Sequence, residues 1–163
     1  MSERWVLNAS PVIVLAKIGR TDLISQLTDE AVIPQAVIDE IVAGPQDDPA
    51  RKTVLRGDFP VSQTVPHPDI LAWDLGAGET AVLSYALETP GWTAILDDGA
   101  ARRCAQAFKV PCKGTLAIVI AARKQGLIAS ASSLLHELLS VGFRLDRNVI
   151  REALQRTVGE NWE

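Results

Sequence analysis

The sequence predicts an α/β protein, and three observations support this. Short apolar stretches alternate with longer amphipathic ones, a pattern typical of parallel strands covered by helices on both faces. The chain has 163 residues, 47% of them hydrophobic and 22% charged, which suits the core of one domain. No internal repeat, low-complexity tract or linker interrupts it. We therefore expect a single α/β domain over residues 1–163.

The first part of the chain predicts three strands separated by helices. Ser10 and Pro11 supply a helix cap and a first-turn proline, and Pro34 opens a later helix that Gly44 closes. Pro60 has no amide donor, which confines its strand to an edge of the sheet. In chain order, we predict a strand at 5–8, helices at 10–18 and 22–27, a strand at 31–34, helices at 35–43 and 46–57, and an edge strand at 59–65.

The second part begins with a loop around Pro66–Pro68 and continues the alternation. Gly76-Ala-Gly-Glu79 introduces a helix, Ser132 or Ser133 caps a later one, and Asp146 caps the last. We predict a helix to about residue 88, a strand at 93–96, a helix at 99–108, an edge strand at 110–112, and helices at 116–124, 134–141 and 146–157.

Charge and cysteine content bear on partners and location. The net charge is −4 and the pI about 5.2, without the excess of Lys and Arg that strong non-specific nucleic-acid binding requires. A nucleic-acid substrate would need a local basic patch or a bound metal. Cys104 and Cys112 lack disulfide or CxxC spacing, and we find neither a secretion signal nor an apolar run of roughly 20 residues. We expect reduced thiols in a cytoplasmic protein, away from the membrane.

Acidic and amide side chains stand where predicted strands end and helices begin. Asn8 and the pair Asp97-Asp98 follow apolar strands, and Glu40 and Glu79 lie on helices. Ligands of open α/β sheets bind beyond the carboxyl ends of the strands. Converging oxygen ligands suit Mg²⁺ or Mn²⁺, which activate water and neutralise charge on a phosphate. These residues therefore predict a metal site.

Each of these residues also has a purely structural explanation. Asn8 could brace a turn, and Glu40 could be a solvated helix residue. Glu79 could favour the positive end of a helix dipole, and one of Asp97 and Asp98 could cap the next helix. Their joint placement at strand ends and helix starts is what favours a site.

Other candidates carry less chemistry. His67 lies in a proline-rich loop and His136 on an amphipathic helix, and neither has neighbours that suggest a metal site or a triad. Gly76-Ala-Gly78 is too short for a dinucleotide or P-loop signature, although a helix start can bind phosphate. Basic residues that could contact phosphate, or simply be solvated, are Arg102, Arg103, Lys113, Arg123 and Lys124.

With these residues in hand, the chain resembles PIN-like domains. It is similar to an uncharacterised prokaryotic branch whose members open with a strand and Asn/Asp-Ala-Ser-Pro, here at residues 8–11. The matching segments occur in the same order over nearly the whole chain and are 6–20, 32–41, 75–80, 96–102, 114–128 and 142–145.

The resemblance implies a fold and an activity. PIN-like domains are three-layer α/β/α sandwiches with a central parallel sheet of order 3-2-1-4-5, and many are Mg²⁺- or Mn²⁺-dependent ribonucleases. They include VapC-like toxins, which pair with a small antitoxin, and homodimers are common among them. The family's acidic positions fall on Asn8, Glu40, Glu79 and Asp98, with Asp97 as a substitute for the last. Ser10 matches a small hydroxyl residue that supports the site.

The departure from the family pattern is Asn8, where active members usually carry Asp. An amide oxygen can coordinate a metal but brings no charge, so we expect weaker metal binding by Glu40, Glu79, Asp97 and Asp98. The leading hypothesis is a ribonuclease that contacts RNA through basic residues at 102, 103 and 113. Alternatively, the chain is a PIN-like module with weakened catalysis that binds nucleic acid or a partner protein. The apolar C-terminal helices could form a dimer surface.

Overall fold

A computed structural model describes residues 3–163 and contains a five-stranded sheet of order β3-β2-β1-β4-β5. Every neighbouring pair of strands runs parallel. The predicted α/β class and strand order are therefore confirmed. The strands are β1 (Arg4–Leu7), β2 (Glu30–Pro34), β3 (Val61–Ser62), β4 (Thr93–Ile95) and β5 (Cys112–Lys113).

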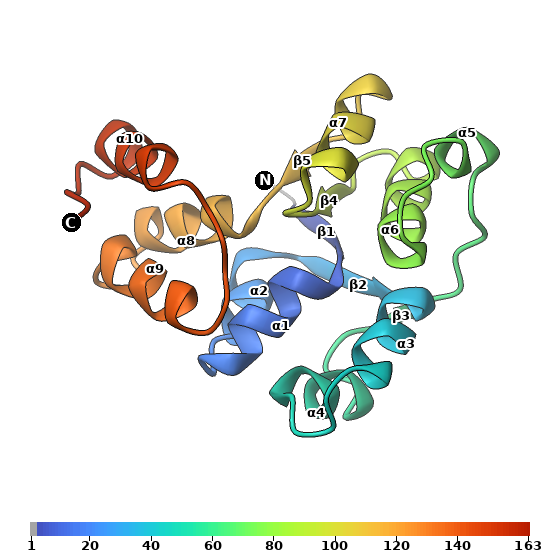
Figure 1. The fold of residues 1–163 in the computed structure, drawn as a ribbon, viewed down its shortest axis with the longest axis horizontal. Coiled ribbons are helices and arrows are strands. Elements are labelled where there is room, and N and C mark those ends of the chain that lie inside the picture. Colours follow the sequence, from blue (N-terminus) through green and yellow to red (C-terminus); the bar gives the residue numbers. More distant parts are fainter. Residues whose placement is uncertain (1–2) are drawn as a thin grey trace.

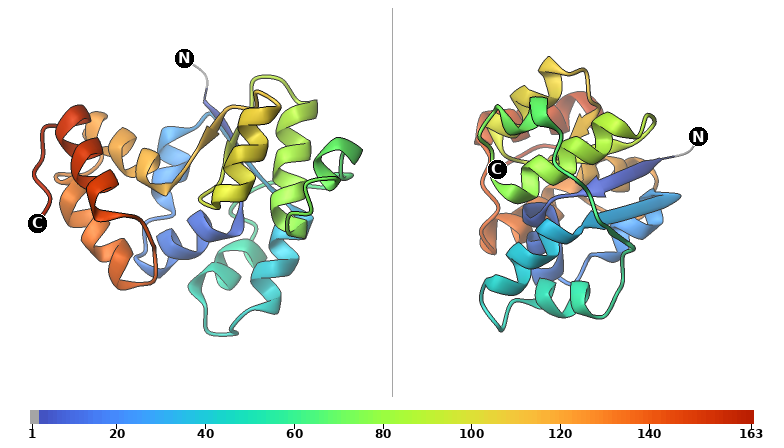
Figure 2. Two further views of the ribbon diagram at one scale, coloured as in Figure 1. Left: turned by 45° about the horizontal axis from the view of Figure 1, so that its top comes forward. Right: turned by 90° about the vertical axis from the view of Figure 1, so that its right-hand side faces the viewer.

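Helices cover both faces of this sheet, which gives the three layers (Figure 1; Figure 2). One face carries α6 (Ala77–Glu88) and α7 (Gly99–Ala107), and the other carries α1 (Ala9–Lys17) and α2 (Asp22–Leu27). Packed beside α1 are α3 (Gln35–Ala43) and α4 (Pro49–Leu55). The last three helices, which form a group next to β5, are α8 (Thr115–Lys124), α9 (Ala131–Ser140) and α10 (Arg147–Thr157).

The central strands are apolar because both of their faces are buried. In β1, Trp5 is 1% exposed and Val6 and Leu7 are fully buried; in β4, Ala94 and Ile95 are fully buried. Continuous apolar runs of this kind are what a doubly covered parallel sheet requires. Among the helices of residues 3–163, none combines the length and apolar character needed to cross a bilayer.

Two helix starts differ from the prediction. The first helix begins at Ala9 rather than at Ser10, because Asn8 has extended backbone and takes the N-cap position without a side-chain cap bond. Ser10 thus lies in the first helical turn, where its hydroxyl is available for another contact. The cap of α9 is Ser130, whose Oγ accepts a hydrogen bond from the Ser133 amide at 3.1 Å, rather than Ser132 or Ser133.

The segments around β3 and β5 also differ. The helix predicted at 46–57 begins only at Pro49, after the Asp48 cap, and the edge strand predicted at 59–65 is reduced to two residues. A one-turn helix, α5 (Pro68–Leu71), replaces part of the predicted loop because the Nδ1 atom of His67 caps it. The last strand is shifted from 110–112 to 112–113, since Pro111 has no amide and contributes only its carbonyl, to Ala94.

Candidate functional site

Strand register brings three loop starts together at the carboxyl edge of the sheet. Leu7 pairs with Ile95, and the Asn8 amide continues the ladder by donating to the Ile95 carbonyl at 3.2 Å. On the other side of β4, the Leu96 amide donates to the Lys113 carbonyl at 2.9 Å. The residues that follow β1, β4 and β5 therefore share one edge, the usual ligand-binding position in this class of sheet.

Asn8 and Glu40 converge on a glycine in the first turn of α6. A Cβ on Gly78 would lie 2.8 Å from Oε2 of Glu40 and 3.2 Å from Oδ1 of Asn8. Asn8 is only 4% exposed, and within residues 3–163 its Oδ1 has no hydrogen-bond partner. A buried oxygen without a donor is uncommon in proteins and points to a group that the protein chain does not itself supply.

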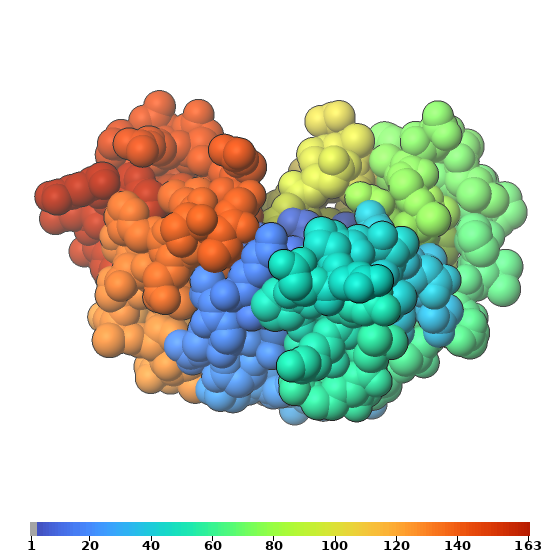
Figure 3. Space-filling model, turned by 60° about the horizontal axis from the view of Figure 1, so that its bottom comes forward, coloured from blue at the N-terminus to red at the C-terminus, as the bar shows by residue number. Residues whose placement is uncertain are grey.

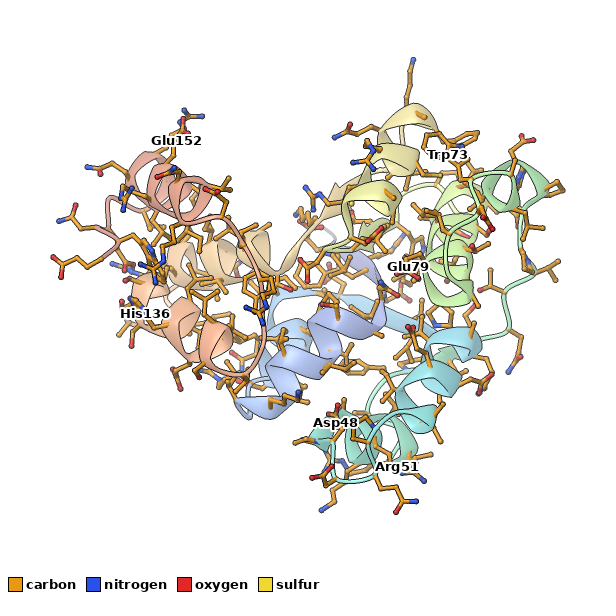
Figure 4. All side chains as sticks on the ribbon, in the orientation of Figure 1. Asp48, Arg51, Trp73, Glu79, His136 and Glu152 are labelled. Atoms are coloured by element: carbon orange, nitrogen blue, oxygen red, sulfur yellow. The ribbon has the colours of Figure 1, made fainter. Side chains whose placement is uncertain are left out.

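Glu79 adds a second carboxylate to this corner. Figure 4 shows it on the side of α6 that faces the strand ends, across from α3, which carries Glu40. Partial burial of the Glu40 carboxylate raises its pKa above the ordinary value, and the nearby negative charge of Glu79 raises it further. Two acids from separate helices thus lie close enough to repel one another. A cation between them would remove that repulsion.

Asp97 is held by a separate set of hydrogen bonds. The amide of Thr115 donates to its Oδ1 at 2.8 Å, and the Thr115 hydroxyl donates to its Oδ2 at 2.6 Å. The Ser10 hydroxyl donates to the same Oδ2 at 3.3 Å. Because Thr115 is fully buried, this carboxylate is anchored between the starts of α1 and α8.

Asp98, the neighbouring acid, caps a helix instead. Its Oδ2 accepts a hydrogen bond from the Ala101 amide at 2.9 Å, which makes it the N-cap of α7.

The predicted RNA contacts are divided between the two ends of the sheet. Arg102 lies on the site side, where its Nη1 donates to the Leu96 carbonyl at 3.1 Å. Arg103 is exposed on the same helix. Lys113 reaches away from the acids, because its Nζ donates to Glu3 at 2.7 Å and Glu3 precedes the first residue of β1. The structure therefore brings Arg102 to the site but not the Lys113 ammonium.

A comparison with protein families settles the family of this fold. A model described as a PIN domain matches residues 4–159. The chain belongs to the PIN domain family. The family indicates a nuclease-type function and nucleic-acid binding, and PIN domains generally use divalent metal ions. A search of curated proteins found no match to the sequence.

The donor atoms at this edge of the PIN domain are of the kind that bind a hard divalent cation, although only two of the three side chains carry a negative charge. The Asn8 amide oxygen and the Glu40 and Glu79 carboxylates are oxygen ligands of the kind Mg²⁺ and Mn²⁺ take. Over residues 3–163, no group of three or more His, Cys, Asp or Glu side chains is arranged to hold a metal. The residues present therefore suit one ion that keeps several water ligands, which is the usual state of protein-bound Mg²⁺.

Thr115 is a residue at the candidate site that the sequence did not reveal. It carries no charge, and it lies at the start of an apolar helix, where a threonine is commonly found for structural reasons alone. Its signal was its position after a short strand at the same sheet edge as Asn8 and Asp97. The two histidines lie elsewhere: His67 caps α5, and His136 stacks on Trp162 with ring centroids 4.0 Å apart.

Proposed function

We propose that this PIN domain hydrolyses phosphodiester bonds in RNA at the carboxyl edge of its sheet. The observation that carries the proposal is the convergence of the Asn8 Oδ1 and Glu40 Oε2 atoms on Gly78, beside Glu79. These three side chains would hold Mg²⁺ or Mn²⁺. When bound, such an ion supplies an activated water and neutralises negative charge on the phosphate.

The protein's own groups would bind and orient the substrate around these acids. Mutual repulsion between Glu40 and Glu79 favours cation binding, and Asn8 directs its unpartnered oxygen to the same place. Asp97, fixed by Thr115 and Ser10, would border the site as an acceptor for water or for substrate hydroxyl groups. Arg102 and Arg103 on α7 would contact phosphate oxygens.

The decisive experiment compares single-stranded and structured RNA in Mn²⁺ and in EDTA. The variant Glu79→Gln should lower the Mn²⁺-dependent rate roughly a hundredfold, because it removes a negatively charged ligand of the proposed ion. Glu88→Gln, an exposed acid at the other end of the same helix, is the matched control and should cleave like the unmodified protein. Cleavage that persists in EDTA, or a Glu79→Gln variant that cleaves in Mn²⁺ as fast as the unmodified protein, would reject the proposed site.

The two adjacent aspartates can be separated in the same assay. The family pattern favours Asp98 as the fourth acid, whereas the contacts to Ser10 and Thr115 favour Asp97. We therefore expect Asp97→Asn to slow cleavage and Asp98→Asn mainly to weaken the start of α7. An inactive Asp98→Asn beside an active Asp97→Asn would assign the role to Asp98.

A second candidate function is a PIN module that binds nucleic acid or a partner protein without cleaving it. The uncharged Asn8 favours this candidate, as does the lack of a three-acid cluster within residues 3–163. Calorimetric titration with Mn²⁺ and an RNA-binding assay separate the two functions. Binding of RNA without measurable Mn²⁺ affinity would support the module.

A toxin role, with a small antitoxin covering the acidic edge, is the finer form of the nuclease proposal. Expression of the protein in the cytoplasm of a bacterial cell should then arrest growth, and Glu79→Gln should relieve the arrest.

A homodimer formed through the C-terminal helices would have little exposed apolar surface to bury. Their apolar faces pack internally, and Val149 is the large hydrophobic residue that these helices expose in the described chain. Light scattering would test the dimer.

A further inference from the structure

A cavity of about 350 Å³ opens next to Asp97, between α8 and the start of α10. Its apolar lining includes Leu116 and Ile120 from α8, Phe143 from the connection after α9, and Val149 from α10. Figure 3 shows the surface hollowed between the orange C-terminal helices and the yellow α7. The cavity is within the size range of pockets that hold small organic groups.

The end of the cavity nearest the acids is polar. A Cβ on Gly114 would lie 2.9 Å from both the Asp97 Oδ1 and the Arg102 Nη1 atoms, so the two groups are close together there. Arg102 donates one N–H to the Leu96 carbonyl and, within residues 3–163, has no acidic partner within 4 Å. This end therefore offers an acceptor and a cationic donor beside an apolar chamber.

We infer that this cavity receives an unpaired base of the RNA, next to the phosphate that is cleaved. The inference rests on the proposed function, because Asp97 lines the cavity and also contacts Ser10 at the acidic edge. A base has apolar faces and a polar edge with donors and acceptors, which matches the chamber and its Asp97–Arg102 end. An apolar side chain of a partner protein would leave the Arg102 guanidinium without an acceptor, because Arg102 donates only to the Leu96 carbonyl within residues 3–163.

The same geometry selects single-stranded RNA over a duplex. A base inside a duplex is stacked and paired, so it must first be unstacked before it can enter a side pocket. A single-stranded segment needs no such step, and Arg102 at the wall can contact its flanking phosphate. Substrates that are unpaired near the cleavage point should bind more tightly than fully paired ones.

Val149 allows a test that leaves the acids untouched. It is 47% exposed at the cavity, so a polar replacement should not disturb folding. We expect Val149→Asn to weaken binding of a labelled single-stranded RNA roughly fivefold or more in EDTA at low ionic strength. The matched control is Val65→Asn, the same change at a 77% exposed residue outside the cavity, and it should bind like the unmodified protein.

An abasic series locates the base. Each nucleotide of the RNA is replaced in turn by an abasic one, and one position should lose roughly tenfold in affinity. In Val149→Asn that loss should shrink, because the cavity no longer holds the base. The inference would be overturned if no abasic position changed the affinity, or if the loss at one position were as large in Val149→Asn as in the unmodified protein. Either result would favour a protein partner as the occupant of the cavity.

The binding assay and the cleavage assay fail independently. RNA that binds with one sensitive position but is not cleaved in Mn²⁺ would reject the nuclease proposal and keep the base pocket. Cleavage that depends on Glu79, together with an RNA affinity that no abasic position changes, would reject the base pocket but support the nuclease proposal.

Discussion

The side chain and the amide of Thr115 both donate to the Asp97 carboxylate, at 2.6 Å and 2.8 Å. The two residues lie 18 positions apart and follow adjacent strands, β5 and β4. Because Thr115 is fully buried, its two donor groups are shielded from competing water. The arrangement ties the C-terminal helices to the edge of the sheet that carries the acids.

Replacing Thr115 by Val should weaken this anchor. The change keeps the shape but removes a hydroxyl donor from a charged acceptor, so we expect a loss of about 2 kcal/mol in the free energy of unfolding. Urea denaturation measures the loss. Thr115→Ser retains the donor and should recover most of the stability; a Val variant as stable as the unmodified protein would contradict the role of this bond.

Asn8→Asp should add a negative charge to the proposed metal site. A carboxylate beside Glu40 adds a third negative ligand, and we expect Mn²⁺ affinity to rise about tenfold in calorimetry. In EDTA the variant should melt at a lower temperature than the unmodified protein, because the new charge faces an acid whose pKa is already raised. The control is Asn148→Asp on α10, which should leave the Mn²⁺ affinity unchanged. Unchanged Mn²⁺ affinity in Asn8→Asp would show that this oxygen does not meet the ion.

Glu40→Gln should stabilise the metal-free protein. The pKa of Glu40 is raised by partial burial and by Glu79, so the folded state holds its proton more tightly than the unfolded state. The ionised side chain therefore lowers stability as pH rises from its ordinary pKa through the raised one. At about pH 7 in EDTA, we expect the variant to melt about 1 °C higher, a small shift because solvent screens this partly exposed group.

In the presence of Mn²⁺, the unmodified protein should melt at a higher temperature than Glu40→Gln, the reverse of the order in EDTA. The unmodified protein should gain thermal stability on binding the ion, and Glu40→Gln should gain little. Asp39→Asn, an exposed acid next to it in sequence, serves as the control and should respond to Mn²⁺ like the unmodified protein. A Glu40→Gln variant that gains as much from Mn²⁺ would remove Glu40 from the proposed ligands.

Glu160 should make the stability of the C-terminal helices depend on pH. Burial raises its pKa, but donors from Ser132, Ala131, Ser130 and Arg123 together outweigh burial and hold the pKa below its ordinary value. This stabilisation is complete above the ordinary pKa and is lost as pH falls through the lowered one.

The variant Glu160→Gln tests this directly. It should lose about 2 kcal/mol at neutral pH, because hydrogen bonds to a charged acceptor are replaced by weaker ones. The difference from the unmodified protein should vanish in acid. Denaturation at several pH values measures it, with the exposed Glu137→Gln on α9 as the control. A difference that stays constant with pH would exclude the charge of Glu160 as its source.

Much of the fold follows from local sequence. The apolar run at 5–7 becomes β1, Gly44 ends α3, and Asp146 caps α10, because apolar periodicity and capping chemistry act over a few residues. Edge elements were predicted less well. A two-residue strand such as β3 depends on its neighbour for hydrogen bonds, and nothing in its own sequence sets its length.

By itself, the sequence determined the α/β class, the PIN family and the placing of acids at strand ends and helix starts. Only the tertiary structure decided which oxygens meet: Asn8 with Glu40 over Gly78, and Asp97 rather than Asp98 with Thr115. The physical reason is the separation along the chain over which each kind of interaction acts. Helix caps and apolar periodicity are set within one or two turns of the chain. The contacts between these side chains depend instead on strand register and helix packing between residues far apart in the sequence.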